Sequence, residues 1–192
     1  MKYLSLDIET TGVDEQICQI LQVSCIVEDT NLKLPFDELP KFNVYFKHKT
    51  YTFDSATPVS MHHHLIKEVE KYGVNLSVFL IPPIDIIHNH TKTRRNPFAE
   101  FIQDNFGEES VTLAGKNVIS FDVRFLKHNK LLSGIRFKHR AIDPSILYID
   151  WKNDKSLPDS QTMFDRAELD TTVAHDAMDD AWQIIRCLRK FY

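Results

Sequence analysis

The order of extended and helical patterns along the chain limits the folds that it can adopt. Residues 3–9 alternate apolar and polar side chains. Residues 17–28 are rich in β-branched and apolar residues, a composition that favours a strand but is also compatible with a short helix. Residues 42–53 alternate aromatic and polar side chains and indicate a third, half-exposed strand. Three successive strands therefore open the predicted fold.

Helical and extended patterns alternate in the rest of the chain. The clearest helix covers residues 176–191, where apolar side chains recur at helical spacing. Early strands followed by alternating helices and short strands predict an α/β fold with a mixed central sheet flanked by helices. The other expected helices cover residues 60–72, 97–105 and 121–132, and further extended segments are expected at 110–114 and 140–149.

Composition limits the classes of protein to which the chain can belong. Its 192 residues, 43% of them hydrophobic, suit a single domain over residues 1–192. A net charge of −4 argues against a broad basic surface that coats DNA, so any nucleic-acid contact is expected to be local. Cys18, Cys25 and Cys187 lack CxxC spacing and indicate reduced thiols in a cytoplasmic protein. Because every apolar run is short, no membrane partner is expected.

Two acidic side chains stand on one face of the first strand. Asp7 and Glu9 are two residues apart, so they point the same way as Tyr3 and Ser5. Like charges side by side repel and are costly to bury. Either this face is wet, or a divalent cation, which prefers oxygen ligands, makes the pair favourable.

Two expected helices each carry one acid that faces inward. Asp180 lies at the edge of the apolar stripe of the last helix, whereas Asp176 and Asp179 point elsewhere. Asp122 opens another helix and shares a face with the apolar residues three and four positions later. An acid at a helix N-terminus can also serve as a capping group alone.

Three short motifs contain these acids. DIETTG stands at 7–12, SFDVRFL at 120–126 and HDAMDDA at 175–181. Together they resemble the D-x-E-T-T-G, F-D and H-x-A-x-x-D-A motifs of the DEDDh (DnaQ-like) superfamily of 3′→5′ exonucleases, which has a ribonuclease H-like fold. The chain departs from this pattern at Val118, where many members have Asn, and Asn117 comes one residue earlier. A long stretch between the first two motifs predicts an insertion or extended loop around residues 74–97.

The resemblance implies a mechanism and a set of site residues. It implies hydrolysis of phosphodiester bonds at the 3′ end of single-stranded DNA or RNA, with release of nucleoside 5′-monophosphates. Two divalent ions, Mg²⁺ or in its place Mn²⁺, would be needed, and His175 would act as general base. The implied metal ligands are Asp7, Glu9, Asp122 and Asp180, and the implied substrate contacts are Thr10, Thr11, Gly12, His62 and Phe121.

Narrower functions remain open at this point. The chain could be an oligoribonuclease-type enzyme restricted to short RNA. It could also be a proofreading-type subunit or nucleic-acid-binding module that works only with a partner, such as a polymerase or a second copy of itself.

Two further features have more than one interpretation. The histidines at 62–64 could form a zinc site with His88 and His90, although histidines also occupy hydrated helix faces. The basic run of Lys92, Arg94 and Arg95 lies in the expected insertion and could contact phosphate. The two tryptophans are expected to serve packing rather than base stacking.

Overall fold

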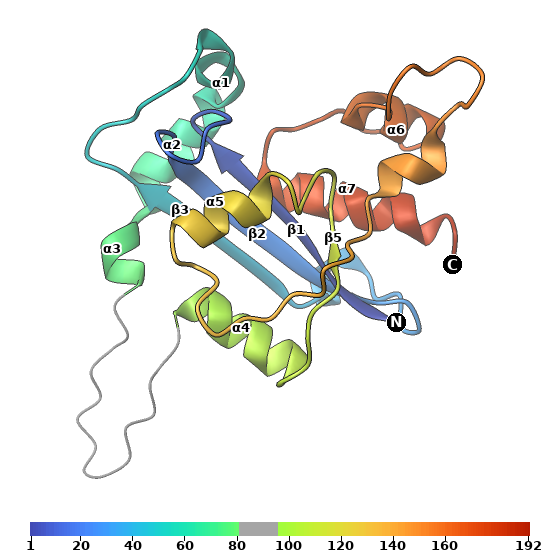
Figure 1. The fold of residues 1–192 in the computed structure, drawn as a ribbon, viewed down its shortest axis with the longest axis horizontal. Helices are drawn as coiled ribbons and strands as arrows, with labels where there is room; N and C mark the ends of the chain where they lie inside the picture. The colour runs from blue at the N-terminus through green and yellow to red at the C-terminus, as the bar shows by residue number, and fades with distance from the viewer. Residues whose placement is uncertain (81–95) are drawn as a thin grey trace.

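A five-stranded mixed sheet forms the centre of the molecule (Figure 1). The computed structural model describes residues 1–80 and 96–192. The strand order is β4-β3-β2-β1-β5. Antiparallel pairs join β1 to β2 and β2 to β3, whereas β5 pairs with β1, and β4 with β3, in parallel. The strands are β1 (Lys2–Thr10), β2 (Ile20–Asp29), β3 (Lys41–Lys47), β4 (Val74–Asn75) and β5 (Leu113–Ala114).

The three N-terminal strands confirm the order read from the sequence. The second segment is a strand, so the alternative of a short helix is wrong. The third strand ends at Lys47 rather than at residue 53. Beyond it the chain leaves the sheet, and the backbone N–H of Thr52 donates to Gln19 Oε1 instead of to a neighbouring strand.

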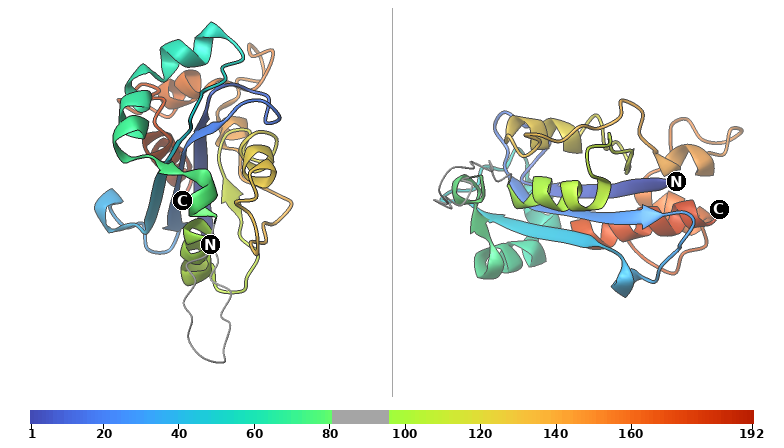
Figure 2. Two further views of the ribbon diagram at one scale, coloured as in Figure 1. Left: turned by 90° about the vertical axis from the view of Figure 1, so that its left-hand side faces the viewer. Right: turned by 90° about the horizontal axis from the view of Figure 1, so that it is seen from below.

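Helices cover both faces of the sheet (Figure 2). α4 (Pro97–Phe106) and α5 (Asp122–His128) lie on one face, and α2 (His63–Tyr72) and α7 (Ala177–Arg189) lie on the other. α7 packs along β1 and β2, and α2 packs against β2 and β3. This arrangement confirms the predicted α/β class.

Several local predictions need correction. The helix expected at 60–72 is interrupted at His62, which separates α1 (Ala56–Met61) from α2. α5 ends at His128, and Lys130 just beyond it has a positive φ of 60°. The segment expected to be extended at 140–149 forms a single bridge at Ile142 and then a 3₁₀ helix, η2 (Pro144–Tyr148), because the Asp143 side chain caps its first turn. The remaining short helices are η1 (Phe36–Glu38), α3 (Leu76–Phe79) and α6 (Ser160–Arg166), and α6 was not expected from the sequence.

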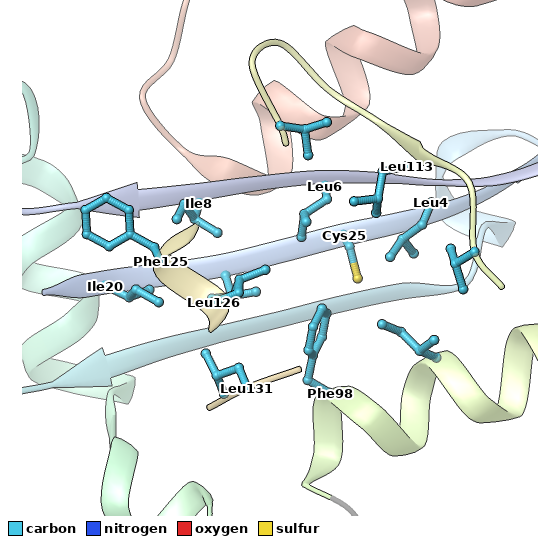
Figure 3. Close-up of a cluster of buried hydrophobic side chains, with 14 of the residues drawn as sticks. Leu4, Leu6, Ile8, Ile20, Cys25, Phe98, Leu113, Phe125, Leu126 and Leu131 are labelled. Atoms are coloured by element: carbon cyan, nitrogen blue, oxygen red, sulfur yellow. The ribbon is translucent and has the colours of Figure 1, made fainter. Parts of the chain in front are cut away.

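The alternation in β1 separates an apolar core from a polar interface. Leu4, Leu6 and Ile8 point toward α4 and α5, where they pack against Phe98 and Phe125 (Figure 3). Burying one such side chain stabilises the fold by about 1.5–3 kcal/mol. The opposite face of β1 meets α7, and there the strand carries its acidic residues.

Residues 81–95 lie outside the described residues, and with them most of the expected insertion at 74–97. The histidines at 88 and 90 and the basic run at 92–95 fall in this part. The flanking residues form β4, α3 and the start of α4, so residues 74–79 are more regular than expected. In the described ranges, no helix combines the length and the apolar character that crossing a membrane requires.

Candidate active site

The end of β1 brings two acids into the interior. Glu9 is only 7% exposed and Asp7 is half-buried. The pairing of β1 with β2 shifts register between Glu9 and Thr10. Such irregularities terminate pairing and redirect side chains. The strand therefore turns away immediately after it has presented Asp7 and Glu9.

α5 supplies a third acid. Asp122 is its first residue and is only 3% exposed, because Phe125 and Leu126 on the same helical face anchor α5 in the core. Burial raises the pKa of Asp7, and the charges of Asp122 and Glu9 raise it further. The carboxylates of β1 and α5 are therefore close enough to repel each other.

α7 completes the acidic cluster. Its N-cap is Asp176, and the first turn carries Asp180. Asp180 Oδ1 is buried and has no hydrogen-bond partner within the described part of the chain. His175 precedes the cap with a φ of 52°. Ligand atoms of Glu9, His175 and Asp180 lie within 4.8 Å of one another, so strand and helix meet at a potential metal site.

The electrostatics of this cluster favour a bound cation. Burial, followed by the charges of Asp180, Asp176 and Asp122, raises the pKa of Glu9 to about 9. Burial likewise raises the pKa of Asp122 to about 8 and that of Asp180 to about 7. Among the described residues no Lys or Arg forms an ion pair with these carboxylates. Hard oxygen donors, one of them without a partner, fit a divalent ion such as Mg²⁺.

A cavity of about 550 Å³ opens beside Glu9. Gly12 lines this cavity and packs closely against Asp54, since a Cβ at position 12 would lie 2.3 Å from Asp54 Cγ. The Asp54 carboxylate accepts a hydrogen bond from the Val13 backbone N–H at 2.6 Å and thereby fixes the turn after β1. The lining residues are Ile8, Glu9, Thr10, Gly12, Val13, Asp54, Ser55, Thr57, Pro58, Met61, His62 and Phe121.

The structure places Thr11 away from this cavity. Its side chain is fully buried. The Thr11 hydroxyl accepts a hydrogen bond from Gln19 N at 2.8 Å and donates one to Gln19 Oε1 at 3.2 Å. Thr11 therefore stabilises the turn after β1 through its hydrogen bonds with Gln19. The other implied substrate contacts line the cavity: Thr10, Gly12, His62 and Phe121.

His62 is the buried member of the histidine cluster. Its Nε2 lies 3.5 Å from Glu9 Oε2, and its ring centroid lies 6.4 Å from that of His175. Burial lowers its pKa, and the nearby His175 lowers it further. His63 and His64 are exposed. In the ranges 1–80 and 96–192 these three histidines do not form a metal-binding group; the other two histidines of the zinc alternative lie outside the described residues.

A second cavity, of about 500 Å³, shares Ile8 and Phe121 with the first. Asp7 and Asp122 line it together with Lys116 and Asn117. Burial lowers the pKa of Lys116. Val118, at the position where the resemblance leads one to expect Asn, is instead buried in the core. Asn117 has a φ of 56° and faces the cavity from one residue earlier.

Sequence patterns did not single out several residues that surround the cluster. Asp176 was placed away from the apolar stripe, yet its charge raises the pKa of Asp7 and Glu9. An Asp directly before a helix is a capping signal that could have drawn attention to it. Gln22 interrupts an apolar strand, and a polar residue in such a strand signals a specific buried partner. Lys116 and Asp54 gave no comparable signal.

Comparison with known proteins supports the fold assignment. No protein-family model and no curated protein sequence matches the chain. Among solved structures, E. coli Exonuclease I in complex with a dT13 oligonucleotide matches 98% of the chain with a TM-score of 0.65 and 16% identity. Cell-death related nuclease 4 (CRN-4) matches 98% with a TM-score of 0.61 and 20% identity. A zinc-bound form of an E. coli Exonuclease I–single-stranded DNA complex matches with a TM-score of 0.62 and 15% identity.

These similarities concern the fold. The chain spans 40% of the Exonuclease I chain and 62% of the CRN-4 chain. It has a ribonuclease H-like α/β fold that it shares with these nucleases.

Proposed function

We propose that the chain is a DEDDh (DnaQ-like) exonuclease that removes nucleotides from the 3′ end of single-stranded DNA or RNA and releases nucleoside 5′-monophosphates. The observation that carries this proposal is the cluster of buried and half-buried groups formed by the four acids and His175, with Glu9 lining a cavity of about 550 Å³. The shared fold supports it, because some of the matching structures are complexes with dT13 or dA16 oligonucleotides.

The four carboxylates would hold two divalent ions, with Mg²⁺ favoured by the oxygen donors and Mn²⁺ as a substitute. Asp180 Oδ1, which is buried without a partner in the described structure, is suited to such a ligand role. When bound, the ions would provide an activated water and neutralise charge on the phosphate.

His175 would serve as the general base. Its ring lies close to Glu9 and Asp180, and an imidazole can accept a proton near neutral pH. A ring nitrogen of His175 would take the proton from the attacking water. The neighbouring carboxylates would stabilise the imidazolium that results.

The two cavities suggest how a nucleic-acid end would lie. Ile8, Met61 and Phe121 give the first cavity an apolar wall that suits a base. Lys116 in the second cavity provides a cation for a phosphate. Phe121 borders both cavities, so a strand end would pass over its ring with the scissile phosphate near Asp7 and Asp122.

A degradation assay on the isolated chain tests this function. Strands of DNA and RNA with a 5′ label should shorten stepwise with Mg²⁺, and a 3′-phosphate should slow the first step. The Asp7→Ala variant should be inactive. Activity restricted to a dinucleotide RNA would favour the short-RNA enzyme, and activity only after a partner is added would favour the subunit. A fully active Asp7→Ala variant would refute the mechanism.

A further inference from the structure

A buried glutamine connects the two halves of the site. Gln22 lies in β2, directly opposite Glu9 of β1 in the strand register. It is 0% exposed, like its apolar neighbours in the strand, Leu21 and Val23, even though its own side chain is polar. Burying an amide is costly unless its polar atoms are hydrogen-bonded. The hydrogen bonds of Gln22 therefore indicate which parts of the structure it holds together.

The Gln22 amide is bonded on both sides. Its Oε1 accepts a hydrogen bond from the Ala177 backbone N–H at 3.0 Å. Its Nε2 donates to Asp176 Oδ2 at 3.2 Å and to Asn43 Oδ1 at 3.1 Å. Only one orientation of the amide matches an N–H donor on one side and a carboxylate on the other. The amide is thus fixed in position between β3 and the start of α7.

These contacts reach the turn that carries catalytic groups. Asp176 caps α7 by accepting hydrogen bonds from Met178 N at 2.9 Å and Asp179 N at 3.2 Å. Gln22 therefore holds both the cap side chain and an N–H of the first helical turn. His175 adjoins this cap, and Asp180 N donates to the Asp176 backbone oxygen at 2.9 Å.

We propose that Gln22 is a positioning residue that sets the spacing between Glu9 on β1 and the His175–Asp180 turn of α7. This inference rests on the proposed function, because that spacing matters only if the cluster binds metal. Groups that orient metal ligands without touching the ion typically change metal affinity or activity by about 10–100-fold when mutated. Gln22 acts one step farther out, through the Asp176 cap that adjoins the ligands, so we expect an effect at the lower end of this range.

The test compares three variants with the wild type. Gln22→Met keeps the side-chain volume and removes every hydrogen bond of the amide. Asn43→Ala removes one acceptor of that amide at an exposed position, so it reports on the same network with little risk to folding. Glu28→Gln is the matched control, because Glu28 is a fully buried residue of β2 that binds the other end of α7 through Arg189 at 2.9 and 2.7 Å.

Mn²⁺ affinity is measured by calorimetry without nucleic acid, and kcat and KM are measured at saturating metal. Gln22→Met should weaken Mn²⁺ binding by about 10-fold or more and lower kcat, with KM changed by less than about twofold. Asn43→Ala should shift affinity and kcat in the same direction by a smaller factor. Glu28→Gln should lower thermal stability and leave Mn²⁺ affinity unchanged.

Equal Mn²⁺ affinities for Gln22→Met and the wild type would overturn the inference, as would an equal loss in Glu28→Gln. If Gln22→Met does not fold, unchanged affinity and kcat in Asn43→Ala would overturn it. A wild-type protein that binds no Mn²⁺ and degrades no strand would instead refute the proposed function.

Discussion

Replacing Asp122 with Asn should stabilise the metal-free protein at pH 8 while it weakens metal binding. Burial raises the pKa of Asp122 from 3.8 to about 8. Between these values the unfolded chain has lost a proton that the folded chain keeps. Ionisation therefore favours unfolding, and the stability of the metal-free protein falls as pH rises through this window. Asn has almost the same shape as Asp and carries no charge, so the variant does not lose stability at this position as pH rises.

The size of the effect follows from the shift in pKa. One pKa unit corresponds to about 1.4 kcal/mol, so the whole shift sets an upper bound of about 6 kcal/mol. Protonation of one acid in the cluster reduces the electrostatic repulsion on the others. Only part of the upper bound should therefore appear as a change in stability. We expect a gain of about 2 kcal/mol at pH 8, which for a chain of this size raises Tm by about 4–8 °C.

Thermal unfolding of the metal-free proteins at pH 5 and pH 8 measures this effect. The gain in Tm should be clear at pH 8 and only about a third as large at pH 5, because pH 5 lies near the lower end of the window that opens at the unfolded-state pKa of 3.8. Adding Mn²⁺ at pH 8 should raise the Tm of the wild type far more than that of Asp122→Asn. Glu28→Gln breaks a buried ion pair with Arg189 and should lower Tm at both pH values. A lower Tm for Asp122→Asn than for wild type at pH 8 would refute the reasoning.

Three further outcomes follow from the site. His175→Ala should lower turnover by about 100-fold or more and change Mn²⁺ affinity much less, and an unchanged rate would remove His175 as the base. Gly12→Ala should cost about 1–2 kcal/mol in urea unfolding because its Cβ displaces the Asp54 carboxylate and breaks its hydrogen bond with the Val13 N–H; equal stability would show that Asp54 moves without losing this bond. Mn²⁺ affinity should increase from pH 6 to pH 9, with protons released, because the raised pKa values of Asp180 and Glu9 are about 7 and 9. Affinity that does not change with pH in calorimetry would contradict this.

The parts of the fold that sequence patterns predicted are those with long, regular periodicity. β1, β2 and α7 each have an apolar face that must be buried, so the pattern and the structure agree. Short elements were missed because tertiary contacts decide them. α6 has only seven residues and depends on its Asp159 cap and on the packing of Met163 and Phe164.

Residues of the candidate site could be predicted only where an inward-facing position on a strand or helix coincides with a recognisable motif. The four acids and His175 lie in motifs that resemble those of a known superfamily. The structure places ligand atoms of Glu9, His175 and Asp180 within 4.8 Å of one another, and the charge of Asp122 acts on Asp7. Local patterns mark Gln22 and Asp176 as unusual, but the hydrogen bond between them depends on the packing of α7 across β2, which those patterns do not encode. Trp151 was expected to pack but is 77% exposed, whereas Trp182 packs against Phe36 with ring centroids 5.3 Å apart.

Equilibrium binding of Mn²⁺ without nucleic acid tests the carboxylate cluster most directly. Calorimetric titration of the wild type should show two ions per chain, and Asp180→Ala should bind fewer or bind them much more weakly, with its fold retained by circular dichroism. No binding to the wild type at millimolar Mn²⁺, or identical titrations for the two proteins, would contradict the assignment of Asp7, Glu9, Asp122 and Asp180 as a metal site.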